Sequence, residues 1–420
     1  MKVLLIVIDG MGDIGEKTPL EEANTPNMDF LAMLGKTGIY YPLKGIAPGS
    51  GEAMLSILGY NPKEYYPGRG PLEALGLGHR IKRGELALRG DLCTFYNGKI
   101  IDRRAGGISN KEGKELAKYL DRHVLITDTN VKVLHAINHR INVILSYKKP
   151  LGDKISTNDE EYEILLSDHD IELLNAKNTF SPYTPKPIVP LENTESNKKS
   201  AELLNQFISK SYALLNNHYL NKERIKSKKL PANFVILRGA GNKLLNPKNI
   251  REKTKKLWAM IAEMPLEIGV AKYIGMEVLN VEKKDNIIDS LNEKIEVLKE
   301  NWDEYDAFYF YIKSPDIYGH LGDFDGKKHS LELIDKHFFY RLTDEFDLKD
   351  VLIVVTADHS TPVSLKRHSS NPVPLLIFGP NVSKDKVEKF GENFCKEGEL
   401  GVVEGTQLMD LIVKFSRNES

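Results

Sequence analysis

Three apolar runs of the chain each end close to an aspartate, and this feature restricts the possible folds more than any other. The runs are Lys2–Ile8, Ala307–Ile312 and residues 351–355. The carboxylates that follow them are Asp9, Asp316 and Asp358. Short uninterrupted apolar runs are typical of strands that are buried on both faces of a parallel sheet. The pattern therefore predicts a sheet that delivers three carboxylates to one edge.

Histidines accompany two of these aspartates. His320 follows Asp316 by four residues, and His359 and His368 follow Asp358. Divalent cations such as Mn²⁺ and Zn²⁺ bind mixed carboxylate and imidazole ligands, and these five groups exceed what one tetrahedral ion needs. We therefore predict two metal ions. For Asp316 and His320 alone, the alternative is a pair of ordinary polar residues at a strand end.

A serine lies in the loop before a helix-like segment, residues 53–58. This residue is Ser50, between Gly49 and Gly51. Metal coordination lowers the pKa of a bound hydroxyl, which produces a nucleophile at neutral pH, and a helix N-terminus attracts a phosphate. Ser50 is therefore the candidate nucleophile, although a Gly-Ser-Gly segment by itself is an ordinary turn.

The length and the order of the segments indicate two domains. A chain of 420 residues exceeds what one hydrophobic core usually organises. Asp9 and Ser50 serve the later ligands only if both ends of the chain share one sheet. We expect residues 1–90 and 250–420 to form a metal-binding, doubly wound, mostly parallel α/β domain. Residues 91–249 then form a smaller inserted α/β domain that grips the substrate. Helical periodicity is expected at 257–268.

Charge and cysteine content restrict the partners and the compartment. The formal net charge is −1, so no basic excess indicates nucleic acid or an anionic membrane, and a small-molecule substrate fits better. Cys93 and Cys395 lie far apart, and no signal peptide precedes the first strand. No apolar run approaches the roughly 20 residues that span a bilayer. We expect a cytoplasmic protein, with no prediction of its oligomeric state.

Several longer motifs resemble one known family. They include VIDGMGD, TPLEEANTPNMDFLA, PGSGEAMLSILGYNP, GRGPLEALG, DRRAG, RGAG, SPDIYGH, TADHSTPVSLKRHSSNPVPLLIFGP and FGENFCKEGELG. In this order they resemble the archaeal type of cofactor-independent (2,3-bisphosphoglycerate-independent) phosphoglycerate mutase, within the alkaline phosphatase superfamily. The resemblance implies an alkaline-phosphatase-like sheet domain interrupted by the inserted domain.

The resemblance also implies a reaction and its residues. Asp316, His320 and His368 would hold one ion, and Asp9, Asp358, His359 and the Ser50 oxygen would hold the other. The ions would be Mn, Mg, Zn or Co, and 2,3-bisphosphoglycerate would not be needed. Ser50 would become a phosphoserine while 3-phosphoglycerate and 2-phosphoglycerate interconvert, a step of glycolysis and gluconeogenesis.

An anionic substrate calls for arginines, whose paired N–H donors match planar oxyanions. The motif context favours Arg104 and Arg238, and Arg140 less strongly. Asp102 would accept a glycerate hydroxyl or orient a neighbouring arginine. For each arginine taken separately, a surface salt bridge is an equally good interpretation.

The chain departs from the family pattern in its substrate-handling half. Gly51 stands where relatives generally carry Asp, and Gly107 where they carry Arg. Glu160 and Glu161 replace the Pro-His of an Asp-Pro-His motif, and Glu267 replaces a Lys. They keep two alternatives open. One is a metal-dependent phosphatase or phosphotransferase acting on another small phosphate ester. The other is a non-catalytic protein that binds a phosphometabolite.

Overall fold

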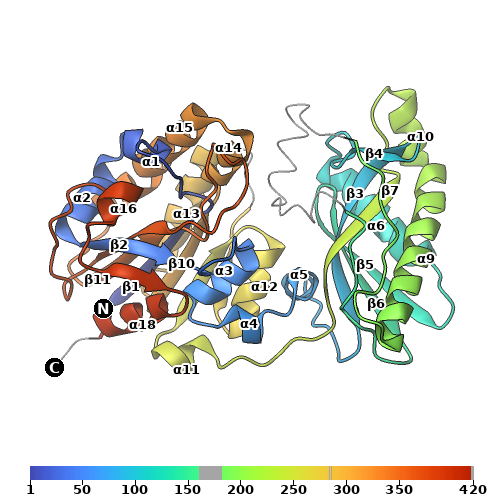
Figure 1. Cartoon of the computed structure of the whole chain (residues 1–420), viewed down its shortest axis with the longest axis horizontal. Helices are drawn as coiled ribbons and strands as arrows, with labels where there is room; N and C mark the ends of the chain where they lie inside the picture. Colours follow the sequence, from blue (N-terminus) through green and yellow to red (C-terminus); the bar gives the residue numbers. More distant parts are fainter. Residues whose placement is uncertain (160–181, 283, 285, 418–420) are drawn as a thin grey trace. The chain divides into compact units, whose positions relative to one another are not determined.

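The computed structural model describes residues 1–159, 182–282, 284 and 286–417, and it divides into two compact units (Figure 1). Unit 1 consists of Met1–Tyr66 and Pro247–Ser420, and unit 2 of Pro67–Asn246. The boundary expected near residue 90 lies instead between Tyr66 and Pro67. The reason is that residue 90 falls within β3 (Leu86–Tyr96), a central strand of unit 2.

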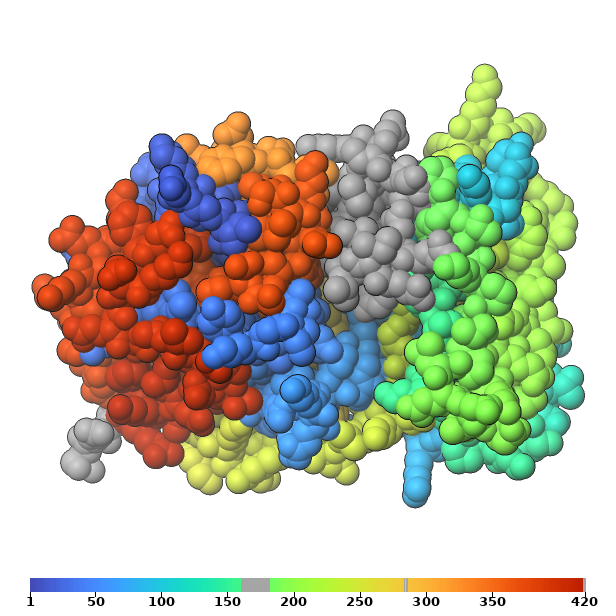
Figure 2. Space-filling model, in the orientation of Figure 1, coloured from blue at the N-terminus to red at the C-terminus, as the bar shows by residue number. Residues whose placement is uncertain are grey.

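An eight-stranded sheet forms the centre of unit 1, in the order β13-β2-β12-β11-β1-β10-β8-β9. Its strands are β1 (Lys2–Ile8), β2 (Lys36–Tyr41), β8 (Trp258–Ala262), β9 (Glu277–Asn280), β10 (Ala307–Ile312), β11 (Val351–Thr356), β12 (Val373–Phe378) and β13 (Gly401–Glu404). All pairs are parallel except those that β12 makes with β11 and β2. The predicted parallel-dominated α/β sheet is confirmed, and both ends of the chain contribute to it. On the face of unit 1 in Figure 2, blue N-terminal segments lie next to red C-terminal segments.

Helices cover both faces of this sheet (Figure 1). One layer contains α1 (Pro19–Glu22), α2 (Pro26–Leu34), α13 (Ile287–Glu300), α14 (Pro315–Leu321), α15 (Phe324–Ile334), a π-helical turn η1 (Asp335–Phe339) and α16 (Tyr340–Glu345). The remaining helices of unit 1 are α3 (Ser50–Ile57), α4 (Pro62–Tyr65), α11 (Ile250–Thr254), α12 (Pro265–Ile274), α17 (Glu392–Cys395) and α18 (Gln407–Phe415). None of the helices in the described ranges is both long enough and apolar enough to cross a bilayer.

The helix expected over residues 257–268 is wrong for its first half. Trp258–Ala262 forms strand β8, whose residues are all buried, and helix α12 starts only at Pro265. A short buried strand and a buried helical segment have the same apolar composition, so periodicity does not separate them. Pro265, which suits the first turn of a helix, marks the true start of α12.

The parallel register aligns the ends of three central strands. Ile8 of β1 lies opposite Ile312 of β10, and Val7 lies opposite Thr356 of β11. The segments that follow these strands therefore leave the sheet at the same edge, where ligands bind in open α/β sheets. This register brings together residues that are up to 350 positions apart in the sequence.

Unit 2 is built on an antiparallel sheet of five strands. They are β3 (Leu86–Tyr96), β4 (Lys99–Asp102), β5 (Thr129–Ile137), β6 (Arg140–Tyr147) and β7 (Phe234–Gly241). The helices among its described residues are α5 (Arg69–Gly76), α6 (Asn110–His123), α9 (Glu195–Asn217) and α10 (Tyr219–Lys226). The buried apolar residues of α6 and α9, such as Leu116, Leu204 and Phe207, join those of the strands in one hydrophobic core.

Candidate metal centre

Six predicted ligands form two compact sets in unit 1. Asp316, His320 and His368 make the first set, and Asp9, Asp358 and His359 make the second. In each set, one ligand atom per residue lies within 4.8 Å of the others, and all six residues are buried. Both sets lie at the sheet edge where β1, β10 and β11 end.

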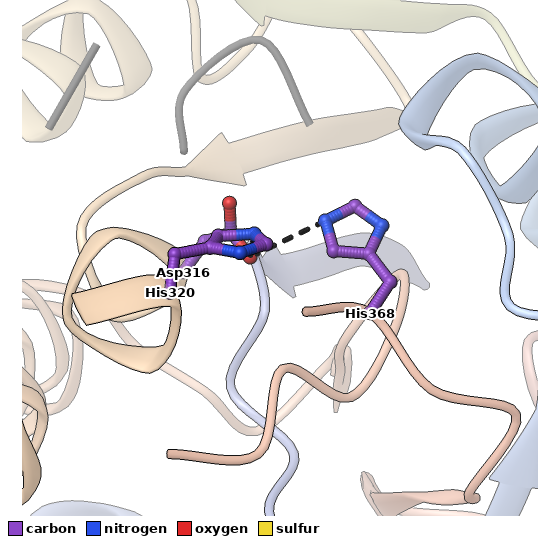
Figure 3. A group of neighbouring side chains, drawn as sticks. All are labelled: Asp316, His320 and His368. Atoms are coloured by element: carbon purple, nitrogen blue, oxygen red, sulfur yellow. Dashed lines mark ion pairs between the residues drawn. The ribbon is translucent and has the colours of Figure 1, made fainter. Parts of the chain in front are cut away.

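The first set has the spacing that a tetrahedral ion requires (Figure 3). The Asp316 Oδ1 atom lies 3.4 Å from His320 Nε2 and 3.6 Å from His368 Nε2. Ligand bonds of about 2.1 Å give a tetrahedron with an edge of about 3.4 Å. The three side chains converge from α14 and from the loop before β12, so they point toward one position.

The second set is equally tight. His359 Nε2 lies 3.3 Å from Asp9 Oδ1 and 3.2 Å from Asp358 Oδ2. The Asp9 Oδ1, His359 Nε2 and His368 Nε2 atoms are buried, and none of them has a hydrogen bond of acceptable geometry to another described residue. Buried polar atoms are almost always satisfied, so these three atoms mark positions that fit a cation.

The electrostatics of the second set support this interpretation. Burial, followed by the nearby charges of Asp358 and Asp316, raises the pKa of Asp9 above its ordinary value. Burial lowers the pKa of His359, but the carboxylates of Asp358, Asp9 and Asp316 outweigh it and raise the pKa well above the usual range. The carboxylates thus draw positive charge to this position, which a divalent cation supplies more fully.

Hydrogen bonds on the far side of each imidazole fix its orientation. Nδ1 of His320 lies 3.1 Å from the Lys366 carbonyl oxygen, and Nδ1 of His368 lies 3.0 Å from that of Pro48. Nδ1–H donation to a carbonyl leaves a lone pair on Nε2, the atom that faces the cluster. His320 and His368 are therefore held in the tautomer that binds a metal.

Thr361 does the same for His359 and also connects the two sets. Its hydroxyl donates to Asp316 Oδ1, so its oxygen is left to accept from His359 Nδ1 at 3.0 Å. The backbone of Thr361 is fixed as well, since its N–H donates to Gly12 and its carbonyl accepts from the buried Lys327 ammonium at 2.9 Å. Sequence reasoning missed this role, for which the only signal is the position of Thr361 inside the TADHSTP motif.

Backbone geometry at the strand ends is specialised for this arrangement. Gly10 has a φ of 60°, and a Cβ atom there would come within 2.4 Å of the Asp316 carboxylate. Ser314 has a φ of 133°, an unusual value for a residue with a side chain. The turn that it forms delivers Asp316 to the first turn of α14.

Ser50 is the first residue of α3, with Gly49 at the N-cap position. Two contacts connect its surroundings to the two sets. The Pro48 carbonyl accepts the bond from His368, and the Ser50 hydroxyl interacts with that of Tyr311, which donates to Asp358 Oδ2 at 2.7 Å. Burial, and then the charge of Asp358, raises the pKa of Tyr311 well above 10, so its hydroxyl stays protonated.

Ser360 is the competing hydroxyl closest in sequence to the ligands. Its Oγ atom is buried, without a hydrogen-bond partner among the described residues. However, Ser360 lies in a β-bridge with Met11 and Ser369 rather than at a helix N-terminus, so no backbone N–H dipole favours a phosphate there. Ser50 has that advantage.

The arginines predicted to bind substrate lie in unit 2. Arg238 is buried, and its Nη1 atom lies 2.6 Å from Asp91 Oδ2 and 3.1 Å from Asp159 Oδ2. Arg140, also buried, lies opposite Asp91 in the antiparallel register of β6 and β3. Burial lowers the pKa of Arg238 to about 10, although the two carboxylates oppose this effect.

Arg104 and Asp102 lie in the turn after β4. Asp102 Oδ1 accepts hydrogen bonds from the backbone N–H groups of Arg104 and Gly106, at 2.7 and 3.0 Å. The Asp102 carboxylate therefore shapes the turn that presents Arg104, whose side chain is only partly buried. Both predicted roles of Asp102, to accept a glycerate hydroxyl or to orient a neighbouring arginine, stay predictions.

Sequence reasoning missed the most deeply buried part of this cluster. Both terminal nitrogens of Arg103 contact the Asp159 carboxylate, and Tyr183 donates to the same group at 2.8 Å. Arg89 donates to Glu73 at 2.9 Å. The available signal was the alternation in β3, where Arg89 and Asp91 project from the same face.

Three departures from the family pattern can be described structurally. A Cβ atom on Gly51 would approach the Tyr66 ring at 3.1 Å, so this ring occupies the space of a larger side chain. Gly107 has a φ of 66° and faces open space. Buried Glu267 accepts from the backbone of Glu263 and pairs with Lys313 Nζ at 2.6 Å. Glu160 and Glu161 lie outside the described residues.

Comparison with known proteins gives one consistent result. The profile of a family described as 2,3-bisphosphoglycerate-independent phosphoglycerate mutase matches residues 32–221. The protein of that name from Aeropyrum pernix is 37% identical over 417 residues, which cover 96% of this chain and 97% of the relative.

Two solved structures share the fold. A protein of Pyrococcus horikoshii superposes with a TM-score of 0.77 at 29% identity, covering 100% of this chain and 99% of that one. The cofactor-independent phosphoglycerate mutase of Thermoplasma acidophilum superposes with a TM-score of 0.61 at 29% identity, covering 99% and 100%. The similarity thus extends over both units.

Proposed function

Since the chain belongs to the 2,3-bisphosphoglycerate-independent phosphoglycerate mutase family, we propose that Ser50 and the two metal sets of unit 1 move the phosphoryl group of phosphoglycerate. The enzyme is an isomerase that interconverts 3-phosphoglycerate and 2-phosphoglycerate and does not use 2,3-bisphosphoglycerate. The observation that carries the assignment of the site is the contact of Ser50 and its loop with both sets, through Tyr311 and Pro48.

The donor set suits divalent cations. Asp316, His320 and His368 would hold one ion, and Asp9, Asp358 and His359 the other, with the Ser50 oxygen beside them. Such ions stabilise the charge on the transferred phosphoryl group and lower the pKa of a coordinated hydroxyl. An equal mixture of carboxylate and imidazole favours Mn²⁺, Co²⁺ or Zn²⁺ over Mg²⁺, which prefers oxygen ligands.

Residues of the chain itself prepare Ser50 for the transfer. The Tyr311 hydroxyl contacts the Ser50 hydroxyl while it donates its own hydrogen bond to Asp358, and these contacts orient the Ser50 side chain. The first N–H groups of α3 have no partner inside the helix, so they and the helix dipole favour a phosphate on Ser50. The phosphoserine then returns the group to the other hydroxyl of glycerate.

Retention of glycerate is the demanding part of an isomerisation, because water competes for every phosphoenzyme. We assign this task to the arginines of unit 2, namely Arg104, Arg140 and Arg238, with Asp102 as the residue that positions Arg104. Their guanidinium groups match the carboxylate and phosphate of the substrate. The ordered pairs with Asp91 and Asp159 hold Arg238 in one geometry, which lowers the entropic cost of binding.

The departure at Glu267 is compatible with this assignment. The family resemblance implies a lysine there, and in this chain Glu267 holds the Lys313 ammonium at 2.6 Å. Lys313 lies 5.6 Å above the Tyr311 ring, the residue that contacts Ser50. A lysine cation is therefore retained close to position 267, although it comes from the end of β10.

The test is a coupled assay that converts 3-phosphoglycerate to 2-phosphoglycerate without 2,3-bisphosphoglycerate, with free phosphate followed in parallel. We expect isomerisation to exceed phosphate release, and EDTA to abolish turnover until Mn²⁺, Co²⁺, Zn²⁺ or Mg²⁺ is restored. Arg238→Ala should lower the ratio of isomerisation to hydrolysis. Wild-type protein that releases phosphate faster than it forms 2-phosphoglycerate would instead indicate a phosphatase. Fractionation of cells should place the enzyme in the cytoplasm, where we expect its substrate.

The nucleophile is tested by trapping the phosphoenzyme. Rapid acid quench and mass spectrometry should locate the phosphate on Ser50, and Ser50→Ala should remove both the phosphate and the activity. Ser360→Ala is the matched control, because it deletes a buried hydroxyl next to the same ligands. Phosphate found on Ser360 or Thr361 would overturn the assignment.

A further inference from the structure

A basic groove lies in unit 2, on the outer side of helix α6 and against the junction of α9 and α10. Its cavity measures about 690 Å³, a size typical of small-molecule sites. Four cations of α6 line it: Lys111, Lys114, Lys118 and Arg122. The proposed reaction uses none of these residues.

The four cations form one continuous stripe. They follow each other at steps of three, four and four residues, which places them on the same side of α6. At 1.5 Å per residue, the stripe is about 16 Å long. In the described part of the chain none of the four forms an ion pair, whereas Lys198 and Lys199 of α9 are paired with glutamates at 3.2 and 2.6 Å. The stripe thus presents uncompensated positive charge.

Aromatic rings form another wall of the groove. The Tyr119 ring centroid lies 4.3 Å from that of His123 and 4.4 Å from that of His218, which in turn lies 4.9 Å from Tyr219. Among the described lining residues, Glu115 is the one acidic residue, and the Tyr219 hydroxyl donates to it. These rings pack against one another, and Tyr219 remains 53% exposed. An exposed ring next to a row of cations suits stacking of a base beside phosphate groups.

The start of α10 adds to the attraction for anions. His218 is the N-cap residue of this helix and also lines the cavity. The N-terminal end of a helix carries a partial positive charge that favours phosphate. The helix end, the cationic stripe and the rings therefore converge on one ligand chemistry.

We propose that this groove binds a nucleoside triphosphate or diphosphate, with the phosphates along Lys114, Lys118 and Arg122 and the base against the rings of Tyr119 and Tyr219. The negative charge of three phosphates is comparable to the positive charge of the four cations in the stripe. A nucleotide is also small enough for the cavity. The site is separate from the residues assigned to the mutase reaction, so it provides a binding function beyond catalysis.

The experiment is isothermal titration of the whole protein in EDTA at low ionic strength, with ATP, tripolyphosphate and adenosine as separate probes. EDTA removes the contribution of the metal centre. The test variant is Lys114→Glu/Lys118→Glu, and the matched control is Lys210→Glu, an exposed lysine of α9 that does not line the groove. Tyr219→Leu tests the ring wall without changing the charge.

We expect ATP to bind saturably, tripolyphosphate to bind more weakly, and the double variant to lose at least roughly a hundredfold in affinity for ATP, since each charge-assisted contact is worth about tenfold or more. Lys210→Glu should keep the wild-type affinity, and Tyr219→Leu should weaken ATP but not tripolyphosphate. Absence of ATP binding, equal affinities of the double variant and the control, or equal affinities for ATP and tripolyphosphate would overturn the proposal. Tighter binding of a short single-stranded RNA than of ATP would also overturn it.

Discussion

Unit 1 and unit 2 both bury carboxylates, but the pKa values of Asp9 in unit 1 and Asp91 in unit 2 are shifted in opposite directions. In unit 1, burial and the neighbouring charges of Asp358 and Asp316 raise the pKa of Asp9. In unit 2, burial also opposes the ionisation of Asp91, yet Arg238 and Arg89 outweigh it and hold the pKa of Asp91 well below its usual range. The carboxylates around Asp9 would need an added cation for charge balance, whereas Asp91 is balanced by the arginines of its own unit.

This difference separates two ways to build a buried polar site. In unit 1, the charges of Asp358 and Asp316 disfavour the ionised form of Asp9, and a bound cation would relieve this repulsion. The arginine cluster of unit 2 is already paired and well ordered, with Arg103 and Arg238 both on Asp159. We therefore expect changes in unit 1 to act mainly on metal binding and turnover, and changes in unit 2 to act on stability even without metal.

The largest effect should come from Asp358→Asn. The amide keeps the shape of the carboxylate but removes a charged ligand, and each metal contact contributes several kcal/mol in such reactions. Turnover should fall by roughly a thousandfold or more, with loss of bound metal measured by elemental analysis. Asp347→Asn, on the exposed surface, is the control. Wild-type turnover together with wild-type metal content of Asp358→Asn would contradict this comparison.

The next effect should come from Arg103→Ala in unit 2. Removal of one partner from a buried ion pair leaves Asp159 uncompensated and costs about 3–5 kcal/mol. Urea unfolding in EDTA should show this loss in the absence of any ligand. Arg83→Ala, an exposed arginine of the same unit, should change little. If Arg103→Ala is as stable as wild type, the arginine cluster is not a structural network.

The pH dependence of stability sharpens the comparison further. Burial raises the pKa of Glu392 in unit 1 to about 7, although it accepts a bond from Thr18. Because the folded state binds this proton more tightly than the unfolded chain, acidification from about pH 7 to about pH 4.3 should stabilise unit 1 by on the order of 3 kcal/mol. This contribution disappears as the pH rises through 7.

Asp91 has the opposite sign. The pKa of Asp91 in the folded state is lowered, so its contribution to stability is present above about pH 4 and is lost as the pH falls below that value.

The Glu392 prediction is tested by urea unfolding between about pH 7 and about pH 4.3. The free energy of unfolding should rise on acidification for the wild type and not for Glu392→Gln, with exposed Glu388→Gln as control. If Glu392→Gln shows the same stabilisation on acidification as the wild type, another titrating group causes it.

The smallest effect should come from Thr361→Val, which has nearly the same shape but lacks the hydroxyl. His359 Nδ1 and Asp316 Oδ1 would both lose their partner. Loss of such an outer contact typically weakens metal affinity by about 10–100-fold. Titration with Mn²⁺ should show weaker binding at both sites, rescue by Thr361→Ser, and little change in stability in EDTA. If Thr361→Val binds Mn²⁺ with wild-type affinity, the inference that Thr361 supports both ligand sets is wrong.

The parts of the structure that could be predicted from the sequence are those where strand and ligand are adjacent. Asp9 and Asp358 follow their strands within two residues, so the strand end determines where each side chain lies. The same reasoning failed at Trp258–Ala262, where an apolar run gives no periodicity to separate strand from helix.

Other features depend on contacts that no local pattern records. Arg103 and Arg104 are neighbours in one motif, and only the approach of Asp159 decides that Arg103 is the buried one. The link from Thr361 to Asp316 likewise requires the register of β10 and β11 against β1. Residues of this kind become visible only when the tertiary structure is known.

The central position of β1 has a consequence for biosynthesis. Within the part of the chain that the structure describes, the strand pairs only with β10 and β11, which begin at Ala307 and Val351. At ribosomal speeds of roughly 5–20 residues per second, the apolar segment Lys2–Ile8 waits about 15 to 60 s for its first partner. Unit 2, whose chain is continuous, is completed within that interval. The nascent chain therefore carries an unpaired, aggregation-prone strand beside a finished domain, and a chaperone that shields the first residues should raise the yield of active enzyme.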